Sequence, residues 1–334
     1  MKTHADLARV SCAICHAPAE VVEDAYPGYR APSRYQIAQC RGCEVSFAIP
    51  TQSDEELYEL IYSQSAMIPG YDRYDYYASV ICGARSPLDF LAAQEENYWA
   101  VREACASLPA NAEILDAGSG LGYLAFALAA AGFRATGLDL SEEAVARARR
   151  RFGDYYVAAD FFEWARRYPQ RYDMVVMLEL IEHVNDPRRW IDAALRLIKP
   201  GGCVLISTPN RRFYPTGTVW ETEAPPVHLW WFSPAAIERL TNGSGVTIRY
   251  PDFTRCGVAP KAIPQVPIRT VRSPMLDEAG KPVSRLRRLL HRFGLLSLAM
   301  SMYRARESRR RARAAASIDP VRRETLAATL WKQT

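Results

Sequence analysis

Residues 113–123 read Glu-Ile-Leu-Asp-Ala-Gly-Ser-Gly-Leu-Gly-Tyr, an apolar run that ends in three alternating glycines. Glycines at this spacing let the backbone turn sharply out of a strand, and they bring main-chain N–H groups and a helix N-terminus close to a ligand. Asp139 follows Gly120 by 19 residues, at the end of the next apolar run. A carboxylate at this distance can accept hydrogen bonds from two ribose hydroxyls. The stretch therefore predicts a strand, turn and helix that bind an adenosine-containing cofactor.

The order of the glycines argues against a dinucleotide. The dinucleotide fingerprint is G-x-G-x-x-G, whereas here Gly122 comes one residue early and Asp116 stands two residues before Gly118. An anion beside the turn disfavours a pyrophosphate and favours a ligand that carries positive charge. The pattern D-x-G-x-G-x-G resembles motif I of class I S-adenosylmethionine-dependent methyltransferases.

The resemblance implies a set of cofactor-binding residues. In that family the glycine turn lies under the adenosyl-methionine moiety, and the acid after the second strand holds the ribose. Asp160 stands where the family has an acid or amide facing the adenine amino group, with Phe161 beside the ring; its alternative role is a simple N-cap of the helix at 161–167. The residues implied to contact S-adenosyl-L-methionine are Asp116, Gly118, Ser119, Gly120, Gly122, Asp139, Leu140, Asp160, Phe161 and Leu178.

Composition predicts a globular chain. It has 334 residues, of which 49% are hydrophobic, so it can form one large or two modest domains. We expect a cytoplasmic protein, because no run approaches the ~18 apolar residues of a membrane span and the N-terminus lacks a signal peptide's apolar core.

The net charge of +5 is unevenly placed, because residues 285–313 hold ten arginines and one acid. Leucines at helical spacing favour docking of the segment at 283–316 on the domain. The alternatives are a solvated helix face, or contact with an anionic partner such as nucleic acid or, peripherally, a membrane surface.

Two C-x-x-C pairs predict a structural zinc site of the ribbon kind. Cys12 and Cys15 are separated from Cys40 and Cys43 by 24 residues that are rich in turn formers. Four thiolates complete a tetrahedral site and leave no open coordination position. In a cytosolic chain such spacing indicates metal binding, and a redox or incidental pairing is the alternative.

From residue 112 onward, strands alternate with capped helices. Strands are expected at residues 113–117, 135–139, 155–160, 172–178, 204–207, 246–250 and 253–257. This order predicts an α/β fold with a seven-stranded Rossmann-like methyltransferase sheet, parallel with an antiparallel edge strand. The expected parts are a zinc ribbon at 1–50, a helical lid or acceptor-side segment at 51–110, the S-adenosylmethionine-binding domain at 111–258, and a Pro-rich loop with a basic helical segment at 259–334. Tyrosines at 71–77 either pack between helices, which we favour, or line an acceptor pocket.

The residues after the fourth strand are candidates for catalysis. The E-x-x-E-H run from Glu179 through Glu182 to His183, with His228 later, resembles ubiquinone-type O-methyltransferases and enzymes that methylate RNA 3′ ends at the ribose. The resemblance implies that these four residues hold a divalent ion such as Mg²⁺ or Mn²⁺, which lowers the pKa of the acceptor oxygen. The alternatives are that His183 acts as a base without metal, or that the group is structural.

The expected function is S-adenosylmethionine-dependent methyl transfer to oxygen of a small-molecule or glycan-like acceptor. No N-P-P-Y-type motif follows the fourth strand, which argues against methylation of exocyclic base amines. Two other hypotheses remain: an RNA methyltransferase that uses the ribbon and basic arm for binding, and a scaffold that binds S-adenosylmethionine without catalysis.

Overall fold

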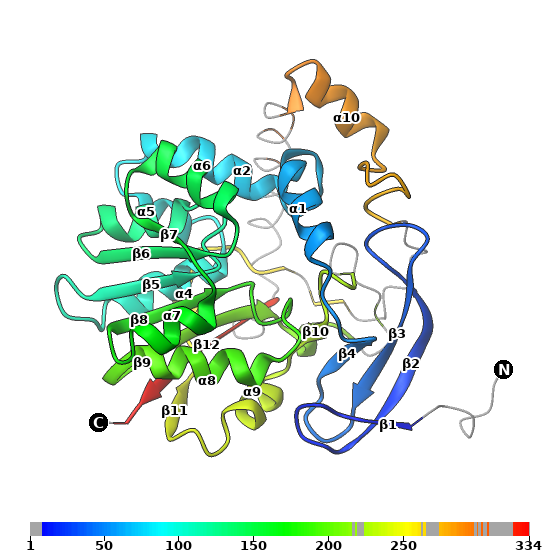
Figure 1. Ribbon diagram of the computed structural model, residues 1–334, viewed down its shortest axis with the longest axis horizontal. Helices are drawn as coiled ribbons and strands as arrows, with labels where there is room; N and C mark the ends of the chain where they lie inside the picture. Colours follow the sequence, from blue (N-terminus) through cyan, green and yellow to red (C-terminus); the bar gives the residue numbers. More distant parts are fainter. Residues whose placement is uncertain are drawn as a thin grey trace.

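A seven-stranded sheet is the largest element of the fold (Figure 1). The computed structural model describes residues 9–215, 218, 224–261, 263–264, 274–296, 299, 302, 306 and 323–333. The strands of this sheet are β5 (Glu113–Ala117), β6 (Arg134–Asp139), β7 (Tyr156–Ala158), β8 (Tyr172–Leu178), β9 (Ile198–Pro209), β11 (Val246–Arg249) and β12 (Thr325–Lys332), in the order β11-β12-β9-β8-β5-β6-β7. Because β7, β6, β5, β8 and β9 are parallel, their carboxyl ends meet at one edge, where ligands bind in such sheets.

Helices cover both faces of the sheet. They are α3 (Pro87–Ala92), α4 (Glu96–Cys105), α5 (Tyr123–Ala130), α6 (Glu142–Phe152), α7 (Phe161–Arg167), α8 (Pro187–Leu197) and α9 (Pro234–Thr241). Adjacent residues of one strand, such as Ile114 and Leu115, belong to different core clusters, because successive side chains point to opposite faces. Side chains at the N-caps fix several helix starts: Ser141, Asp160, Asp186 and Ser233 each accept a hydrogen bond from the backbone N–H three residues on.

The seventh strand differs from the expectation. Residues 253–257 are not a strand, because Phe253–Arg255 forms a short 3₁₀ helix (η4). The place is taken by β12, which lies between β9 and β11 and is antiparallel to both. Its middle residues are buried on both faces, as expected for an internal strand. The strand expected at 253–257 and the predicted domain end at residue 258 are therefore wrong, because the sheet includes residues 325–332. The expected antiparallel edge is present as β11, which pairs antiparallel with β12.

A second sheet contains the cysteine pairs (Figure 1). Its strands are β1 (Arg9–Ser11), β2 (Pro18–Pro27), β3 (Arg34–Cys40), β4 (Ser46–Ile49) and β10 (Trp230–Trp231), each antiparallel to the next. β10 comes from a distant part of the chain, and its two tryptophans are at most 1% exposed. The ribbon expected at residues 1–50 is therefore completed by β10, and its sheet shares its core with the larger one.

The chain from β4 to β5 forms the helices of the lid-side segment. They are α1 (Glu55–Ser63), η1 (Ser65–Met67), α2 (Asp72–Val80) and η2 (Ile81–Gly83), followed by α3 and α4. α3 and α4 are separated at Glu95, whose backbone is extended. Tyr77 is 2% exposed and packs edge-on against Tyr98 at 5.8 Å, as the favoured packing interpretation requires. Tyr74 stacks on Tyr123, which begins α5, so the lid-side helices contact the end of the glycine turn.

The basic helix α10 (Arg285–Arg292) extends away from both sheets (Figure 1). None of its residues is buried. The expected docking on the domain therefore does not hold for Leu286 and Leu289 of this helix, which are exposed, whereas Leu296, beyond the helix, is buried. Most of the remaining basic segment lies outside the described residues. Within the part of the chain that the structure describes, no helix is long and apolar enough to cross a bilayer.

Candidate active site

The glycine turn lies at the carboxyl end of β5 and has the backbone that its glycines permit. Gly118, Gly120 and Gly122 have φ of 73°, 49° and 81°, a region that residues with a Cβ rarely occupy. A Cβ on Gly122 would lie 2.6 Å from the Ala148 Cβ, so no larger residue fits there. The N–H groups of Gly118 and Ser119 donate to the Leu138 carbonyl at 2.8 and 3.0 Å, which fastens the turn to β6.

Two acids stand beside this turn. Asp139 accepts hydrogen bonds from the N–H groups of Gly120 (2.8 Å) and Ser141 (2.9 Å). Asp116 is 4% exposed, and its Oδ2 has no hydrogen-bond partner among the described residues. Burial, and then the charge of Asp139, raise the pKa of Asp116 to about 7. A buried carboxylate oxygen without a partner fits a cationic ligand such as S-adenosylmethionine.

The other expected cofactor residues lie along the same sheet edge. Asp160 caps α7 by accepting from the Glu163 N–H at 2.8 Å, which is one of its two expected roles. Phe161 is buried and stacks on Trp190 with ring centroids 4.6 Å apart. Leu140, after β6, is 67% exposed, so its side chain is open to a ligand.

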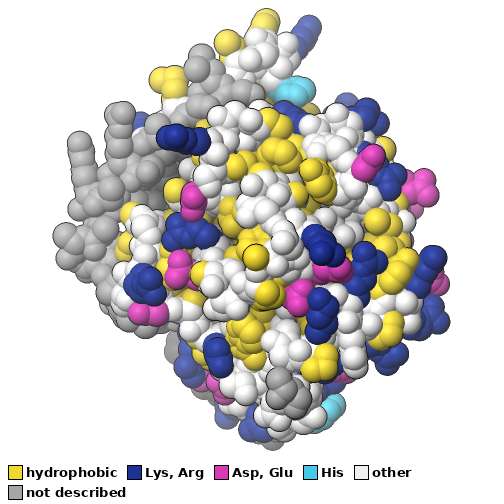
Figure 2. Space-filling view, turned by 90° about the vertical axis from the view of Figure 1, so that its left-hand side faces the viewer, with side chains coloured by type: hydrophobic (Ala, Val, Ile, Leu, Met, Phe, Trp, Pro, Cys, Tyr) yellow, Lys and Arg dark blue, Asp and Glu magenta, His cyan; other side chains and the backbone are white. Residues whose placement is uncertain are grey.

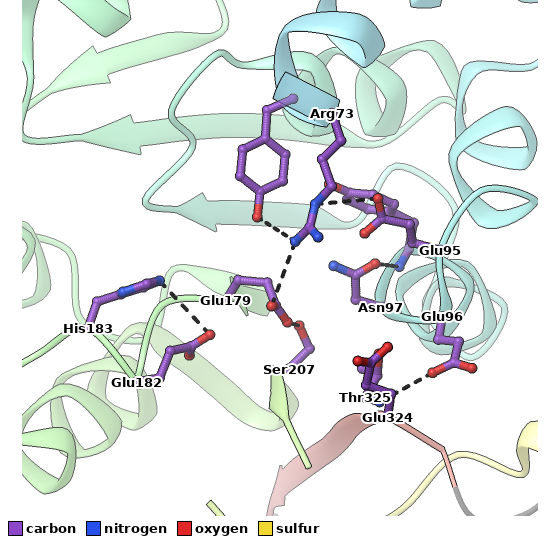
Figure 3. A network of polar contacts seen from close by, with 12 residues as sticks. Arg73, Glu95, Glu96, Asn97, Glu179, Glu182, His183, Ser207, Glu324 and Thr325 are labelled. Atoms are coloured by element: carbon purple, nitrogen blue, oxygen red, sulfur yellow. Dashed lines mark hydrogen bonds and ion pairs between the residues drawn. The ribbon is translucent and has the colours of Figure 1, made fainter. Parts of the chain in front are cut away.

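The loop after β8 brings Glu182 and His183 next to His228. Their ligand atoms all lie within 4.8 Å of one another, from Glu182 and His183 on this loop and His228 before β10. Glu182 is fully buried, and its Oε1 lies 4.0 Å from His183 Nε2 (Figure 3). One carboxylate and two imidazoles at this separation are a donor set that a single metal ion can occupy.

His183 is held as a neutral imidazole. Its Nδ1 lies 2.5 Å from the Val227 carbonyl oxygen, which can only accept, so Nδ1 carries the proton. Burial lowers the pKa of His183 to about 4. The lone pair of Nε2 is therefore available at neutral pH to bind a metal or accept a proton.

Glu179, the fourth expected member, lies in a different network (Figure 3). Its φ is 48°, and its side chain accepts from Ser207 Oγ at 3.2 Å and lies 4.0 Å from Arg73 Nη2. Arg73 Nε is also 3.5 Å from a carboxylate oxygen of Glu95. Burial raises the pKa of Glu179 to about 7, against the opposing effect of Arg73. The structure thus assembles three of the four predicted residues and directs Glu179 toward the lid-side helix α2.

Sequence reasoning missed Arg73. Its guanidinium lies between two carboxylates and donates to the Tyr74 hydroxyl at 2.8 Å. The only signal in the sequence was a single arginine within the tyrosine-rich run at 71–77, whose pairing depends on segments far along the chain.

The four cysteines of the ribbon form a second cluster. All four Sγ atoms lie within 4.8 Å of one another, with 3.8 Å between Cys12 and Cys43 and 3.4 Å between Cys15 and Cys40. A tetrahedral ion with Zn–S bonds of about 2.3 Å requires sulfurs about 3.8 Å apart. A hydrogen bond from the Cys43 thiol lowers the pKa of Cys12 to about 5. The cluster is therefore compatible with a tetrathiolate metal such as zinc.

Comparison with known proteins identifies relatives of the part of the chain that holds the glycine turn. A family model described as a methyltransferase domain matches residues 92–250. Ubiquinone biosynthesis O-methyltransferase of Klebsiella pneumoniae is 39% identical over 113 residues, 32% of this chain and 45% of the relative. The same enzyme of Pseudomonas aeruginosa is 41% identical over 107 residues, 30% of this chain and 46% of the relative. The chain thus spans less than half the length of these curated relatives.

Solved structures with some similarity include a SAM-dependent methyltransferase from Archaeoglobus fulgidus, with a TM-score of 0.44, 15% identity and coverage of 73% of this chain and 94% of that one. Another is 1,6-didemethyltoxoflavin-N1-methyltransferase of Burkholderia thailandensis, with a TM-score of 0.44, 16% identity and coverage of 91% and 98%. The family match and the sequence relatives, together with the glycine turn and its acids, place residues 92–250 in the class I S-adenosylmethionine-dependent methyltransferase family.

Proposed function

We propose that this protein transfers the methyl group of S-adenosylmethionine to an oxygen of a small-molecule or glycan-like acceptor. The observation that carries the proposal is the contact between the glycine turn and the loop that holds the Glu182, His183 and His228 group. A Cβ on Gly118 would lie 3.2 Å from Leu180 Cδ1, in the middle of that loop. The similarity to ubiquinone O-methyltransferases supports oxygen as the methylated atom.

The residues of the turn have separate roles in this proposal. S-adenosylmethionine supplies an electrophilic methyl group on a sulfonium. Asp116 offers its buried carboxylate to the positively charged end of the cofactor, and Asp139 holds the ribose while its hydrogen bond to Gly120 keeps the turn in shape. Methyl transfer is an in-line displacement, so the main contribution of the protein is alignment of donor and acceptor.

The acceptor side then has to bind and deprotonate a hydroxyl. We assign Glu182, His183 and His228 as the residues that would hold a divalent cation, which would supply Lewis acidity and so lower the pKa of the acceptor hydroxyl. Two imidazoles and one carboxylate suit Mn²⁺ or a similar transition ion better than Mg²⁺, which prefers oxygen ligands. Without a metal, Nε2 of neutral His183 can accept the hydroxyl proton directly.

Chelation separates these two mechanisms. We expect EDTA to abolish methyl transfer and Mn²⁺ to restore it, and we expect Glu182→Gln to lose activity while Glu163→Gln, on the exposed face of α7, keeps it. Zinc content is measured in parallel so that loss of the ribbon metal is not mistaken for loss of the catalytic ion. Full activity in EDTA would rule out the metal-dependent mechanism and support His183 as the base.

We also assign the cysteine cluster to a structural zinc ion. Its support is the spacing of the four sulfurs together with N–H groups that donate to them, from Ile14 to Cys12 at 3.4 Å and from Gly42 to Cys40 at 3.2 Å. Four protein ligands leave no position for an acceptor, so the role of this metal is to hold the ribbon together.

The decisive test of the function uses radiolabelled S-adenosylmethionine with fractionated cell extract, followed by mass spectrometry of the labelled product. We expect label in a small-molecule or glycan fraction as an O-methyl group. Label in RNA would show that the acceptor is RNA and would leave the assignment of the cofactor unchanged. Bound cofactor without transfer to any fraction would instead identify a scaffold.

A further inference from the structure

Helix α10 exposes a continuous apolar stripe. Leu286, Leu289, Leu290 and Phe293 are spaced i, i+3, i+4 and i+7, which places them on one side of a helix. Leu286 is 66% exposed, Leu289 52% and Phe293 65%, although side chains of this size are usually covered. Leu290 is half-buried, and beyond the helix Leu296 is buried, whereas Leu295 and Met302 are 49% and 67% exposed. Hydrophobic and basic side chains lie together at the top of the molecule in Figure 2, the height at which α10 lies in Figure 1.

Basic residues border this stripe. Arg285, Arg288 and Arg292 repeat at i, i+3 and i+7 and so follow its flank, and α10 contains no acid. An apolar stripe edged by arginines is the pattern of helices that lie in the interface of an anionic bilayer.

Contacts on another side of α10 hold the helix in place while Leu286, Leu289 and Phe293 stay exposed. Arg287 Nη1 lies 2.8 Å from Asp72 Oδ2 of α2. Just before the helix, the Gly280 carbonyl accepts from Gln64 Nε2 at 2.9 Å, next to α1. The segment further upstream is fixed to the ribbon, where the N–H groups of Met275 and Leu276 donate to the Tyr29 carbonyl at 2.9 and 3.0 Å.

These observations together indicate which kind of partner α10 binds. A second copy of the chain would bring one arginine-rich helix against another, which like charges disfavour. Nucleic acid would use the arginines, but phosphate contacts have no need for exposed leucine and phenylalanine. We infer that α10 docks this protein on an anionic lipid bilayer, with Leu286, Leu289 and Phe293 inserted and the arginines at the headgroups. Because α10 is fixed to α1 and α2, docking also places the lid-side helices next to the membrane surface.

Vesicle flotation of the full chain tests the inference, using phosphatidylcholine vesicles with and without phosphatidylglycerol. We expect flotation only with the anionic vesicles. Each basic residue near such a surface contributes about fivefold to partitioning, so Arg285→Gln, Arg288→Gln and Arg292→Gln together are expected to weaken binding on the order of a hundredfold. The combined Leu286→Asp, Leu289→Asp and Phe293→Asp variant is expected to lose binding altogether.

Matched controls come from exposed residues elsewhere. Their side chains are exposed and lie outside α10: Val22→Asp with Tyr250→Asp for the apolar set, and Arg134→Gln, Arg166→Gln and Arg255→Gln for the charges. Both control variants are expected to float like the wild type.

Three outcomes would overturn the inference. One is that the wild-type protein does not float with the anionic vesicles, or that it binds neutral and anionic vesicles equally. Another is a dimer in analytical ultracentrifugation that the aspartate variant dissolves. The third is tight RNA binding in a filter assay that is lost in the arginine variant and kept in the aspartate variant. Since none of these measurements involves methyl transfer, failure here is separate from failure of the proposed activity.

Discussion

At the scale of single residues, Asp116 has the environment that a cation-binding carboxylate needs. It is buried and its pKa is raised to about 7, so the apoprotein holds it partly protonated at neutral pH. A cationic ligand favours the deprotonated form, and binding below pH 7 must therefore release a proton. The same burial that raises the pKa also strengthens the attraction between the ionised carboxylate and a bound cation.

We therefore predict that affinity for S-adenosylmethionine rises with pH and levels off above about 7, falling by up to about tenfold per pH unit below that value. Asp116→Asn should weaken binding and remove this dependence, whereas Asp154→Asn, on the surface, should keep both. Isothermal titration calorimetry in two buffers of different ionisation enthalpy measures affinity and proton release together. A pH-independent affinity in the wild type would contradict the assignment.

Two glycines at positive φ provide a matched pair for the turn. Gly122 has φ of 81° and no room for a Cβ, while Gly132 has φ of 95° and nothing within 4 Å. Gly132→Ala should cost only the backbone strain, about 1 kcal/mol. Gly122→Ala adds a clash with Ala148 and Tyr156, for a total of about 2–4 kcal/mol. Urea unfolding measures both, and equal costs would show that the turn can relax around a side chain.

At the scale of elements, β12 matters because it is hydrogen-bonded on both sides. Its register runs from Thr325 opposite Pro209 to Trp331 opposite Cys203, and its other edge pairs with β11. Without β12, β9 would expose its backbone and the buried side chains of two core clusters would meet water. The last described strand of the chain is thus an internal strand of the sheet, next to its edge strand β11.

Two leucine-to-alanine substitutions test whether β12 is part of the core while α10 is not. Leu330, in β12, is fully buried, whereas Leu286, in α10, is 66% exposed. We expect Leu330→Ala to lower the free energy of unfolding by about 2–5 kcal/mol, through lost burial and a cavity. Leu286→Ala should change it by less than about 0.5 kcal/mol in the absence of membrane. Chemical denaturation of the two variants side by side checks the pair, and similar losses would show that α10 packs on the domain in solution.

At the scale of the whole molecule, the two sheets are mechanically joined. β10 pairs with β4 of the ribbon, and the Ser233 hydroxyl, which caps α9, donates to the Cys43 carbonyl at 2.7 Å. The Arg211 guanidinium donates from Nε to Ser46 Oγ at 3.1 Å in the same interface. Since His228 lies two residues before β10, the ribbon supports one residue of the acceptor-side group.

We therefore predict that Cys40→Ser removes the zinc and also destabilises the catalytic part, lowering methyl-transfer activity together with the unfolding midpoint. Loss of a structural metal ligand removes binding energy that is also folding energy. Cys82→Ser, at an exposed cysteine outside the cluster, is the control. Elemental analysis and thermal unfolding give the answer, and unchanged zinc content in the Cys40 variant would contradict the metal assignment.

The sequence by itself determined the features that rest on neighbouring residues. The alternating glycines after β5, the caps at Ser141, Asp186 and Ser233, and the C-x-x-C pairs each depend on a few adjacent positions. Such signals are readable because turn geometry, capping and metal-ligand spacing are local.

Only the tertiary structure decided which distant segments meet. β12 pairs with a strand more than a hundred residues earlier, β10 extends the ribbon, and Arg73 turns Glu179 away from the predicted metal group. Each of these outcomes follows from burial and strand pairing between residues far apart in the sequence. Local propensity and periodicity depend on neighbouring residues only, so they do not predict such pairing. Local sequence therefore predicted the cofactor turn, while packing between distant segments brought Glu182 and His183 next to His228.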